Sequence, residues 1–396
     1  MPRFRRNLWL LLAQNLAVFL GIAVQGLVLN LYLVALGYRE DFIGLVTFVQ
    51  TAAIGVGAFP ASAISPRAGP RRTLAAATLA LGLSFGAMAI LGAEPPLLVA
   101  SALSGLAMAH VFVPSAPFLM DNTEPEQRRA GFAANFAALS VASVIGNAIG
   151  GVLPGLVGGA DPGVGGYRAA LLVGAALSLV GVAPLLAADD SRVPIVATPV
   201  APTAGRAAPP SLRRDLVAMA AATSLLAGAT GLVVAFFNVY LRDVVGASTA
   251  TIGTVFAVAS LSMAPASLGG PRAAKRCGPV LIIALTRLAS VPLILALALV
   301  PPGIVSSFLV YVGRAALVSV SQPLDNSFAM ELVPPRLRAR VAALRTVAWN
   351  GGWAVTTGLG GIAIVDVGYP AVFAAAAVLT LVSVGVHWTA FRGRSA

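Results

Sequence analysis

Long apolar stretches, separated by short polar segments, follow one another along almost the whole chain. Twelve of them are long enough to cross the roughly 30 Å hydrocarbon core of a membrane as helices. The polar segments between them, such as GYRED and VPPG, have the glycine, proline and charge content of turns. The pattern predicts twelve membrane-spanning helices at residues 8–33, 42–64, 74–91, 97–120, 132–157, 169–187, 216–241, 252–268, 280–300, 304–328, 341–365 and 371–391.

The composition agrees with this prediction. Of the 396 residues, 58% are hydrophobic and only 10% are charged, and the mean hydropathy is +0.90. A soluble core does not use so large an apolar fraction, so lipid must be the solvent for most of the chain. We therefore expect an all-α integral membrane protein. Because no A-x-A-like cleavage site follows the first apolar run, we expect that run to remain as the first helix.

Positive charges lie unevenly on the two sides of this arrangement. With the N-terminus inside, twenty Lys and Arg residues fall on the cytoplasmic side and only three, Arg39, Arg168 and Arg242, on the outer side. The positive-inside rule then predicts a cytoplasmic membrane protein with both termini in the cytoplasm. Orientation and contact with anionic lipid head groups explain the formal charge of +12, so no nucleic-acid partner is expected.

The second half of the sequence repeats landmarks of the first. Gly44 precedes Gly69 by 25 positions, as Gly253 precedes Gly278, and an Arg-x-Gly-Pro turn surrounds the second glycine of each pair. This nearly constant spacing indicates two halves in parallel orientation. Further matches, at a constant offset of 210 positions, are Phe118, Met120, Asp121 and Arg128 with Phe328, Met330, Glu331 and Arg338.

These landmarks define two pseudo-symmetric six-helix bundles, at residues 1–187 and 215–396. Residues 188–214 between them are rich in proline, alanine and arginine and lack apolar periodicity. We expect this segment to be a flexible cytoplasmic linker. Since one chain supplies both bundles, it is expected to function as a monomer.

The turn after the second span reads SAISPRAGPRR, at residues 62–72. It resembles the Gly-x-x-x-Asp-Arg-x-Gly-x-Arg-Arg turn of the major facilitator superfamily, whose six-plus-six helices and long central loop the chain also resembles over nearly its whole length. Ser62 replaces the first glycine of that pattern, and Pro66 replaces an aspartate that in the family helps to lock the cytoplasmic ends together. The resemblance implies transport by alternating access, with gating residues Arg67, Gly69, Arg71, Arg72, Asp121, Arg276, Gly278 and Glu331.

Two acids at equivalent positions of the halves suggest specific ion pairs. Asp121 follows the fourth predicted span and Glu331 follows the tenth. We expect Asp121 to pair with Arg67 or Arg71, and Glu331 with Arg276, so that each bundle holds together as the halves rock. Solvated surface charge is the alternative, in which case these pairs contribute little.

The segment GNAIGG at residues 146–151 is similar to the Gly-Pro-x-x-Gly-Gly of proton-driven drug exporters, with Asn147 in the place of the proline. This resemblance implies a secondary active transporter that couples efflux of a lipophilic or amphipathic compound to protons. Close helix packing through small residues is the alternative explanation of the segment. Uptake or facilitated diffusion of a metabolite, sugar or organic anion is the alternative function, and a membrane-embedded enzyme or sensor is one of a different class.

Three cationic or titratable side chains lie deep in predicted spans: His110 in the fourth, Arg287 in the ninth and Arg314 in the tenth. Such groups are costly in hydrocarbon and usually face a bundle interior or a water-filled path. In the resembled family the fourth and tenth helices line the cavity, so Arg314 and His110 are better site candidates than Arg287, for which a structural role is expected. Arg314 suits an anionic or polar group, with a structural partner as the alternative.

A histidine titrates near physiological pH, so His110 is a candidate for proton coupling, and a packing role is its alternative. Asp121 and Asp325, near the inner ends of the fourth and tenth spans, complete the proton-coupling candidates. Neutral polar residues on cavity-lining helices add weaker candidates, each of which suits helix association equally well. The predicted substrate-binding residues are Gln25, Asn30, His110, Asn238, Arg314, Gln322, Trp349 and Asn350.

Enzymatic chemistry finds little support in the sequence. No Gly-x-x-x-x-Gly-Lys-Ser/Thr segment occurs, and the only lysine is Lys275. Two histidines and one cysteine, Cys277, are too few for an ordinary metal site or an internal disulfide. We expect a transporter rather than an enzyme, without cofactor or metal, whose partners are the bilayer, a small solute and a proton.

Overall fold

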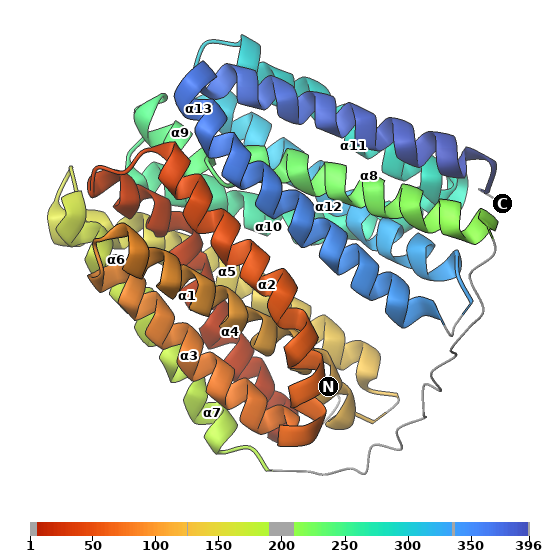
Figure 1. Cartoon of the computed structure of the whole chain (residues 1–396), viewed down its shortest axis with the longest axis horizontal. Helices are drawn as coiled ribbons and strands as arrows, with labels where there is room; N and C mark the ends of the chain where they lie inside the picture. The colour runs from red at the N-terminus through yellow and green to blue at the C-terminus, as the bar shows by residue number, and fades with distance from the viewer. Residues whose placement is uncertain (1–5, 125, 190–209, 335–336, 395–396) are drawn as a thin grey trace. The chain divides into compact units, whose positions relative to one another are not determined.

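A computed structural model describes residues 6–124, 126–189, 210–334 and 337–394 (Figure 1). These ranges contain helices and no strand. The helices are α1 (Arg6–Ala35), α2 (Glu40–Ala68), α3 (Pro70–Ile90), α4 (Glu94–Asp121), α5 (Arg128–Gly158), α6 (Gly163–Val180), α7 (Val182–Leu186), α8 (Pro210–Val234), α9 (Phe237–Asp243), α10 (Thr249–Cys277), α11 (Pro279–Leu299), α12 (Ile304–Glu331), α13 (Arg338–Phe391) and the short 3-10 helix η2 (Arg392–Arg394).

Eleven helical segments of the described residues are long and apolar enough to cross a membrane. Ten of them each coincide with one predicted span, and the eleventh covers the last two predicted spans. The chain is therefore a multi-pass, all-α membrane protein. The structure has eleven such segments rather than twelve because α13 contains both of the last two predicted spans, which meet at a kink at Gly368.

The length of α13 suits two crossings better than one. It contains 54 residues, about 80 Å of helix at 1.5 Å per residue, which is more than twice the thickness of the hydrocarbon core. Its one non-helical residue is Gly368, with φ 82° and ψ 168°, and Pro370 follows closely. Only glycine adopts this φ without strain, so the chain bends there, and Figure 1 shows α13 as two separate limbs.

The described residues group into two compact units. The N-terminal unit holds those of 1–191 and 236–261, and the C-terminal unit those of 192–235 and 262–396. The helix α9 and the first part of α10 thus group with the N-terminal unit, whereas the predicted domain boundary assigns them to the second bundle. Most of the predicted linker, residues 190–209, lies outside the described residues.

Helix packing within each unit buries bulky apolar side chains. In the N-terminal unit α1 contacts α5 and α6, and its Leu8 and Leu11 pack with Phe118 of α4. In the C-terminal unit α8 contacts α13, and the rings of Phe328 and Phe391 meet edge-on with centroids 5.2 Å apart. Because lipid tails are as apolar as these side chains, such contacts stabilise the units mainly through close packing.

The Arg-x-Gly-Pro turns form the same corner in both halves. The backbone of Gly69 ends α2 with φ 92°, and Pro70 is the first residue of α3. The equivalent Gly278 has φ 80°, and Pro279 begins α11. Glycine allows the positive φ, and proline at the first helical position gives up only an N–H that would have no partner within the helix. The predicted tight turns are therefore confirmed.

Glycine also allows helices to pack closely against each other. A Cβ atom on Gly105 of α4 would collide with the carbonyl oxygen of Gln50 on α2 and would lie 2.8 Å from the Cβ of Ala53. Gly26 of α1, by contrast, has open space around the position of a Cβ. The α2–α4 contact therefore depends on the missing side chain of Gly105.

We expect Gly105→Val to destabilise the protein by about 1–3 kcal/mol, because the new side chain must push α2 and α4 apart. The measurement is the thermal unfolding midpoint of the purified protein in detergent. Gly26→Val is the matched control and should leave the midpoint close to that of the wild type. Equal midpoints for the two variants would contradict this account of the α2–α4 contact.

Candidate functional site

Arg314 lies inside the C-terminal unit, where the hydroxyl of Thr230 is its hydrogen-bond partner among the described residues. Only 4% of the residue is exposed, and its NH2 group donates a hydrogen bond to the hydroxyl of Thr230 on α8, 3.0 Å away. That hydroxyl in turn donates to the carbonyl of Leu226 at 2.8 Å. No carboxylate in the described part of the chain lies within ion-pair distance of Arg314, and its Nε has no hydrogen-bond partner there. Its charge is thus buried and only partly satisfied.

A cluster of charged residues lies elsewhere in the C-terminal unit, and we call it the Asp325 cluster: Arg287 of α11, Asp325 of α12, and Arg345 and His387 of α13. The NH2 groups of Arg287 and Arg345 lie 3.1 Å and 2.7 Å from the same oxygen of Asp325, Oδ2. Arg345 also donates to Oδ1 of Asn326 at 3.1 Å. The cluster thereby joins three helices through one carboxylate.

His387 completes this cluster from the end of α13. Only 2% of the residue is exposed, and its ring lies 5.9 Å from that of Phe328 and 5.2 Å from that of Phe391, measured between centroids. Its charge interacts with those of Arg287, Asp325 and Arg345. The histidine is therefore a packed neighbour of the ion pairs rather than a surface group.

Arg345 is a residue that the sequence analysis missed. It lies four residues after the start of the predicted span 341–365, where it interrupts an otherwise apolar run. An arginine inside a predicted span was the available signal, and the same signal identifies Arg287 and Arg314. The expected structural role of Arg287 fits its ion pair with Asp325.

Three of the predicted substrate-binding residues lie on or beside one exposed face. Gln322, Asn326 and Ser327 of α12 and Thr346 of α13 are exposed although both helices have the length and hydropathy of membrane spans. We call these four residues the α12–α13 polar face. Trp349 and Asn350 are half-buried beside it; the ring of Trp349 is 6.3 Å from that of Trp353, and Asn350 donates to the carbonyl of Thr346 at 2.9 Å. Such groups avoid lipid, so the face suits water.

The predicted polar residues of α1 and α9 contact each other. Asn30 donates to Oδ1 of Asn238 at 3.4 Å, and Asn238 donates to the carbonyl of Leu27 at 2.8 Å. Gln25 is buried too, and its amide nitrogen lies 3.8 Å from the sulfur of Met88. These three candidates therefore act as helix-to-helix contacts in this structure, the alternative that the sequence left open.

His110 and Asp121, the proton-coupling candidates of α4, lie apart from the Asp325 cluster along the chain and in the other unit. The half-buried His110 has its Nδ1 2.8 Å from the carbonyl oxygen of Leu106, one turn earlier in the same helix. The carboxylate of Asp121 interacts with the charge of Arg128, which begins α5. Proton coupling through either residue stays a prediction.

The arginine of the first basic turn binds backbone at a helix end. Arg71 donates from Nε to the carbonyl of Leu185 at 2.8 Å and from NH2 to that of Leu186 at 3.0 Å. These carbonyls end α7, where cations stabilise the orphan acceptors of a helix. The expected pairs of Asp121 with Arg67 or Arg71, and of Glu331 with Arg276, stay predictions.

The glycines of the GNAIGG segment lie against other helices. A Cβ on Gly146 would lie 2.6 Å from the Cβ of Ala23 on α1, and one on Gly151 would lie 2.7 Å from the Cα of Gly253 on α10. Asn147, at the place of the exporter proline, donates to the hydroxyl of Ser260 at 3.2 Å. Close packing, the alternative that the sequence left open, thus explains the glycines of this segment as well as the exporter resemblance does.

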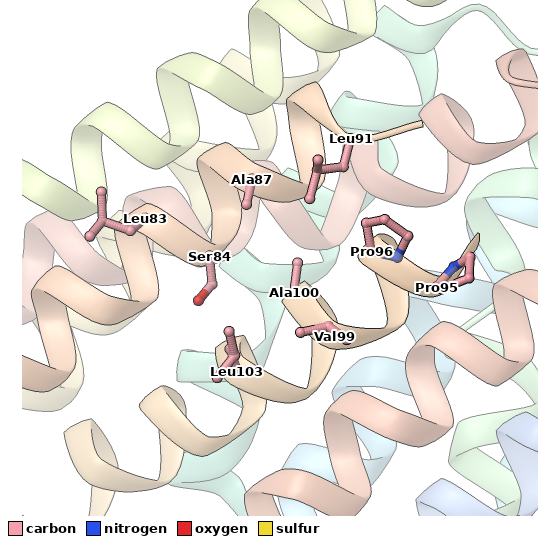
Figure 2. Close-up of a pocket in the computed structure, with 9 residues that line it drawn as sticks. All are labelled: Leu83, Ser84, Ala87, Leu91, Pro95, Pro96, Val99, Ala100 and Leu103. Atoms are coloured by element: carbon pink, nitrogen blue, oxygen red, sulfur yellow. The ribbon is translucent and has the colours of Figure 1, made fainter. Parts of the chain in front are cut away.

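An apolar groove lies between α3 and α4 (Figure 2). Its volume is about 570 Å³. Its polar side chain, Ser84, already donates to the carbonyl of Ala80 at 2.7 Å, and Leu83, Val99 and Leu103 are exposed. The groove offers no polar group to orient a solute, so its chemistry is that of a lipid-facing surface. Its lining residues are Leu83, Ser84, Ala87, Leu91, Pro95, Pro96, Val99, Ala100 and Leu103.

We expect Asp325→Asn to lower the stability by about 3–5 kcal/mol, because it leaves two buried guanidinium groups without their carboxylate. Asp243→Asn is the control, since Asp243 pairs with Arg242 at 3.7 Å at a partly exposed site where loss of a pair costs less than about 1 kcal/mol. Thermal unfolding in detergent compares the two. A midpoint for Asp325→Asn that matches that of Asp243→Asn would contradict the assigned role of the cluster.

Known proteins resemble this chain in sequence pattern and in fold. The family model described as Major Facilitator Superfamily matches residues 11–357. No curated protein sequence matches the chain. A bacterial homolog of the human lysosomal transporter Spinster, solved inward-facing and occupied, superposes with a TM-score of 0.77 at 15% identity, over 97% of this chain and 96% of that one.

Two further solved structures have similar folds. The nucleoside transporter NupG gives a TM-score of 0.74 at 15% identity over 97% of this chain and 99% of its own. The peptide transporter POT in complex with sulfate gives 0.78 at 13% identity over 100% of this chain and 97% of its own. At such identities the likeness concerns the fold alone.

Proposed function

Because this chain belongs to the major facilitator superfamily, we propose that it is a secondary transporter that carries a small organic anion by alternating access. The single observation that carries the proposal is Arg314, a buried guanidinium without a carboxylate partner among the described residues. An isolated buried cation is costly, and a ligand of opposite charge offsets that cost. Carboxylates and phosphates also match the fork of N–H donors on a guanidinium.

The charge balance of the C-terminal unit supports the same ligand class. The described spans of this unit hold three largely buried arginines, Arg287, Arg314 and Arg345, and two buried acids, Asp215 and Asp325. The excess of positive charge favours anions and disfavours lipophilic cations along any path that passes these helices. The α12–α13 polar face supports such a path, because it gives water and polar solutes a surface on the same two helices.

Proton-coupled efflux of a lipophilic or amphipathic compound is the second candidate function. It rests on the resemblance of GNAIGG to an exporter segment. Packing against α1 and α10 explains the glycines of that segment equally well, and the structurally similar proteins include carriers described for nucleosides and for peptides. Direction of transport is therefore left to experiment, while the charge balance favours an anion.

The proposal keeps His110 as the proton-linked residue. Its imidazole is half-buried in α4, and no acid in the described part of the chain lies within ion-pair distance of it. Asp325, in contrast, already serves two arginines, so we assign it to the ion-pair cluster. The distribution of Lys and Arg supports a cytoplasmic membrane with both termini inside, and the presence of both units in one chain supports a monomer.

We expect Arg314→Gln to reduce uptake of an organic anion into proteoliposomes by at least about tenfold, because a lost charge-assisted contact is worth 1.4 kcal/mol or more. The assay offers pools of organic anions, sugars and lipophilic cations in turn. Arg314→Lys keeps the charge but not the fork, so it should retain part of the flux. Arg272→Gln, which removes an exposed arginine of α10, is the control.

Transport of sugars or lipophilic cations that survives Arg314→Gln would refute the anion proposal. Unchanged anion flux in the same variant would refute the role of Arg314 while leaving the substrate class standing. A normal elution profile in size-exclusion chromatography shows for each variant that loss of flux is not loss of fold.

We expect His110→Gln to abolish proton movement that depends on solute, as followed by a pH-sensitive dye inside the liposomes. Exchange of solute across the membrane without a proton gradient should persist, since the amide keeps a hydrogen bond to the carbonyl of Leu106 but does not titrate. Proton movement equal to that of the wild type would exclude His110. Solute flux without any proton movement in the wild type would indicate a facilitator or another coupling ion.

A further inference from the structure

One carboxylate in the Asp325 cluster balances two arginines. Both guanidinium groups approach Oδ2 of Asp325, and no second acid joins them among the described ion pairs. His387, which lies on α13 like Arg345, supplies no fixed negative charge. Two fixed positive charges and one negative charge leave the cluster with a net charge of one positive unit.

This excess charge lies away from bulk water. Side-chain exposure is 2% for Arg287, 11% for Asp325 and 12% for Arg345. A net charge in such surroundings is unfavourable unless a further group of opposite sign is present. The cluster therefore lacks one negative charge.

The cluster also has hydrogen-bond donors to spare. Nε of Arg287 and NH1 of Arg345 are buried and have no hydrogen-bond partner within the described ranges, and Nε2 of His387 has none either. The nitrogens of arginine can only donate, so their missing partners must be acceptors. A buried donor without an acceptor costs about 1–3 kcal/mol. An anion would supply both the missing acceptors and the missing negative charge.

The Asp325 cluster contacts the α12–α13 polar face through Arg345. Arg345 is the most exposed of the three ion-paired side chains, and its NH2 group donates to Asn326, a member of that face. Arg287 lies deeper. Arg345 is thus the arginine of the cluster that is nearer the polar face, and Arg287 is the more buried one.

We propose that the Asp325 cluster binds a small monovalent anion, either a halide or the carboxylate group of an organic molecule, between Arg345 and Arg287. The site is separate from Arg314, which contacts α8 through Thr230. The inference applies whichever solute the protein transports, so it does not rest on the proposed function. In this site Asp325 keeps the two arginines in place and weakens the anion's hold, so that the anion can leave.

The experiment uses iodide, which quenches tryptophan fluorescence, as the probe. Trp349 lies one helical turn after Arg345 on α13, and Trp388 directly follows His387. Sodium iodide replaces sodium fluoride at constant ionic strength in a solution of the detergent-purified full-length protein. Collisional quenching rises linearly with iodide, so a bound iodide appears as an additional, saturable component.

We expect this component in the wild type, and a half-saturating iodide concentration at least about tenfold higher in Arg345→Gln, because the accessible positive charge is lost. Arg345→Lys should fall between the two. Arg340→Gln is the matched control: it removes an exposed arginine of the same helix and should leave the component unchanged.

The Asp325→Asn variant gives the decisive test, because we expect it to bind iodide more tightly than the wild type. Removal of the acid raises the net charge of the cluster, and an elution profile in size-exclusion chromatography equal to that of the wild type shows that the variant is folded. Purely linear quenching in the wild type, equal half-saturation in Arg345→Gln, or weaker binding in an Asp325→Asn protein that keeps the wild-type elution profile would each overturn the proposal.

Competition at fixed iodide identifies the source of the anion. Displacement by acetate but not chloride would assign the site to a carboxylate group, and displacement by chloride but not acetate would assign it to a halide; both support an anion site. Displacement by neither would overturn it. Because the assay measures binding without transport, its failure would leave the role of Arg314 in transport untouched.

Discussion

Hydrocarbon offers polar groups no water to bond with, and this constraint governs the whole chain. Backbone groups are satisfied within long helices, and many serine and threonine hydroxyls bond a carbonyl one turn earlier, as Thr286 does to Ile282 at 2.8 Å and Ser319 to Ala315 at 2.8 Å. Where a helix ends at the two Arg-x-Gly-Pro corners, the N–H of the glycine bonds a carbonyl one turn earlier and the following proline has no N–H to leave unpaired. Charged side chains follow the same rule, because Asp325 is enclosed by two arginines.

The features that this constraint fixes locally were predictable from sequence. Span length follows from membrane thickness, so ten predicted spans each coincide with one apolar helical segment. The corner at Gly69 follows from glycine and proline chemistry. The last two predicted spans share the element α13, in which Gly368 leaves the helical conformation where the sequence predicts a turn. The grouping of α9 with the N-terminal unit could not be read from spacing, since it depends on contacts between segments about two hundred residues apart in the sequence.

Residue type alone predicted which side chains are candidates for the site, but it did not predict which of them are available to a solute. An asparagine in a span suits either a substrate or another helix, and the sequence gives no means of choosing. The structure pairs Asn30 with Asn238, so both satisfy each other and offer less to a ligand. Gln322 has the same chemistry but lies on an exposed face of α12. Position in three dimensions, which sequence spacing does not give, therefore separates residues that join helices from those that are available to solute.

The buried arginines of the C-terminal unit differ in the same way. Arg287 and Arg345 share a carboxylate that offsets part of their charge and fixes their positions. Within the described ranges, Arg314 bonds to the hydroxyl of Thr230, which orients the guanidinium without neutralising it. A ligand that approaches Arg314 meets an entire positive charge, whereas one that approaches the Asp325 cluster must compete with an internal acid. The first arrangement favours strong attraction for a solute that is to be carried, and the second favours weak, reversible occupancy by a small anion.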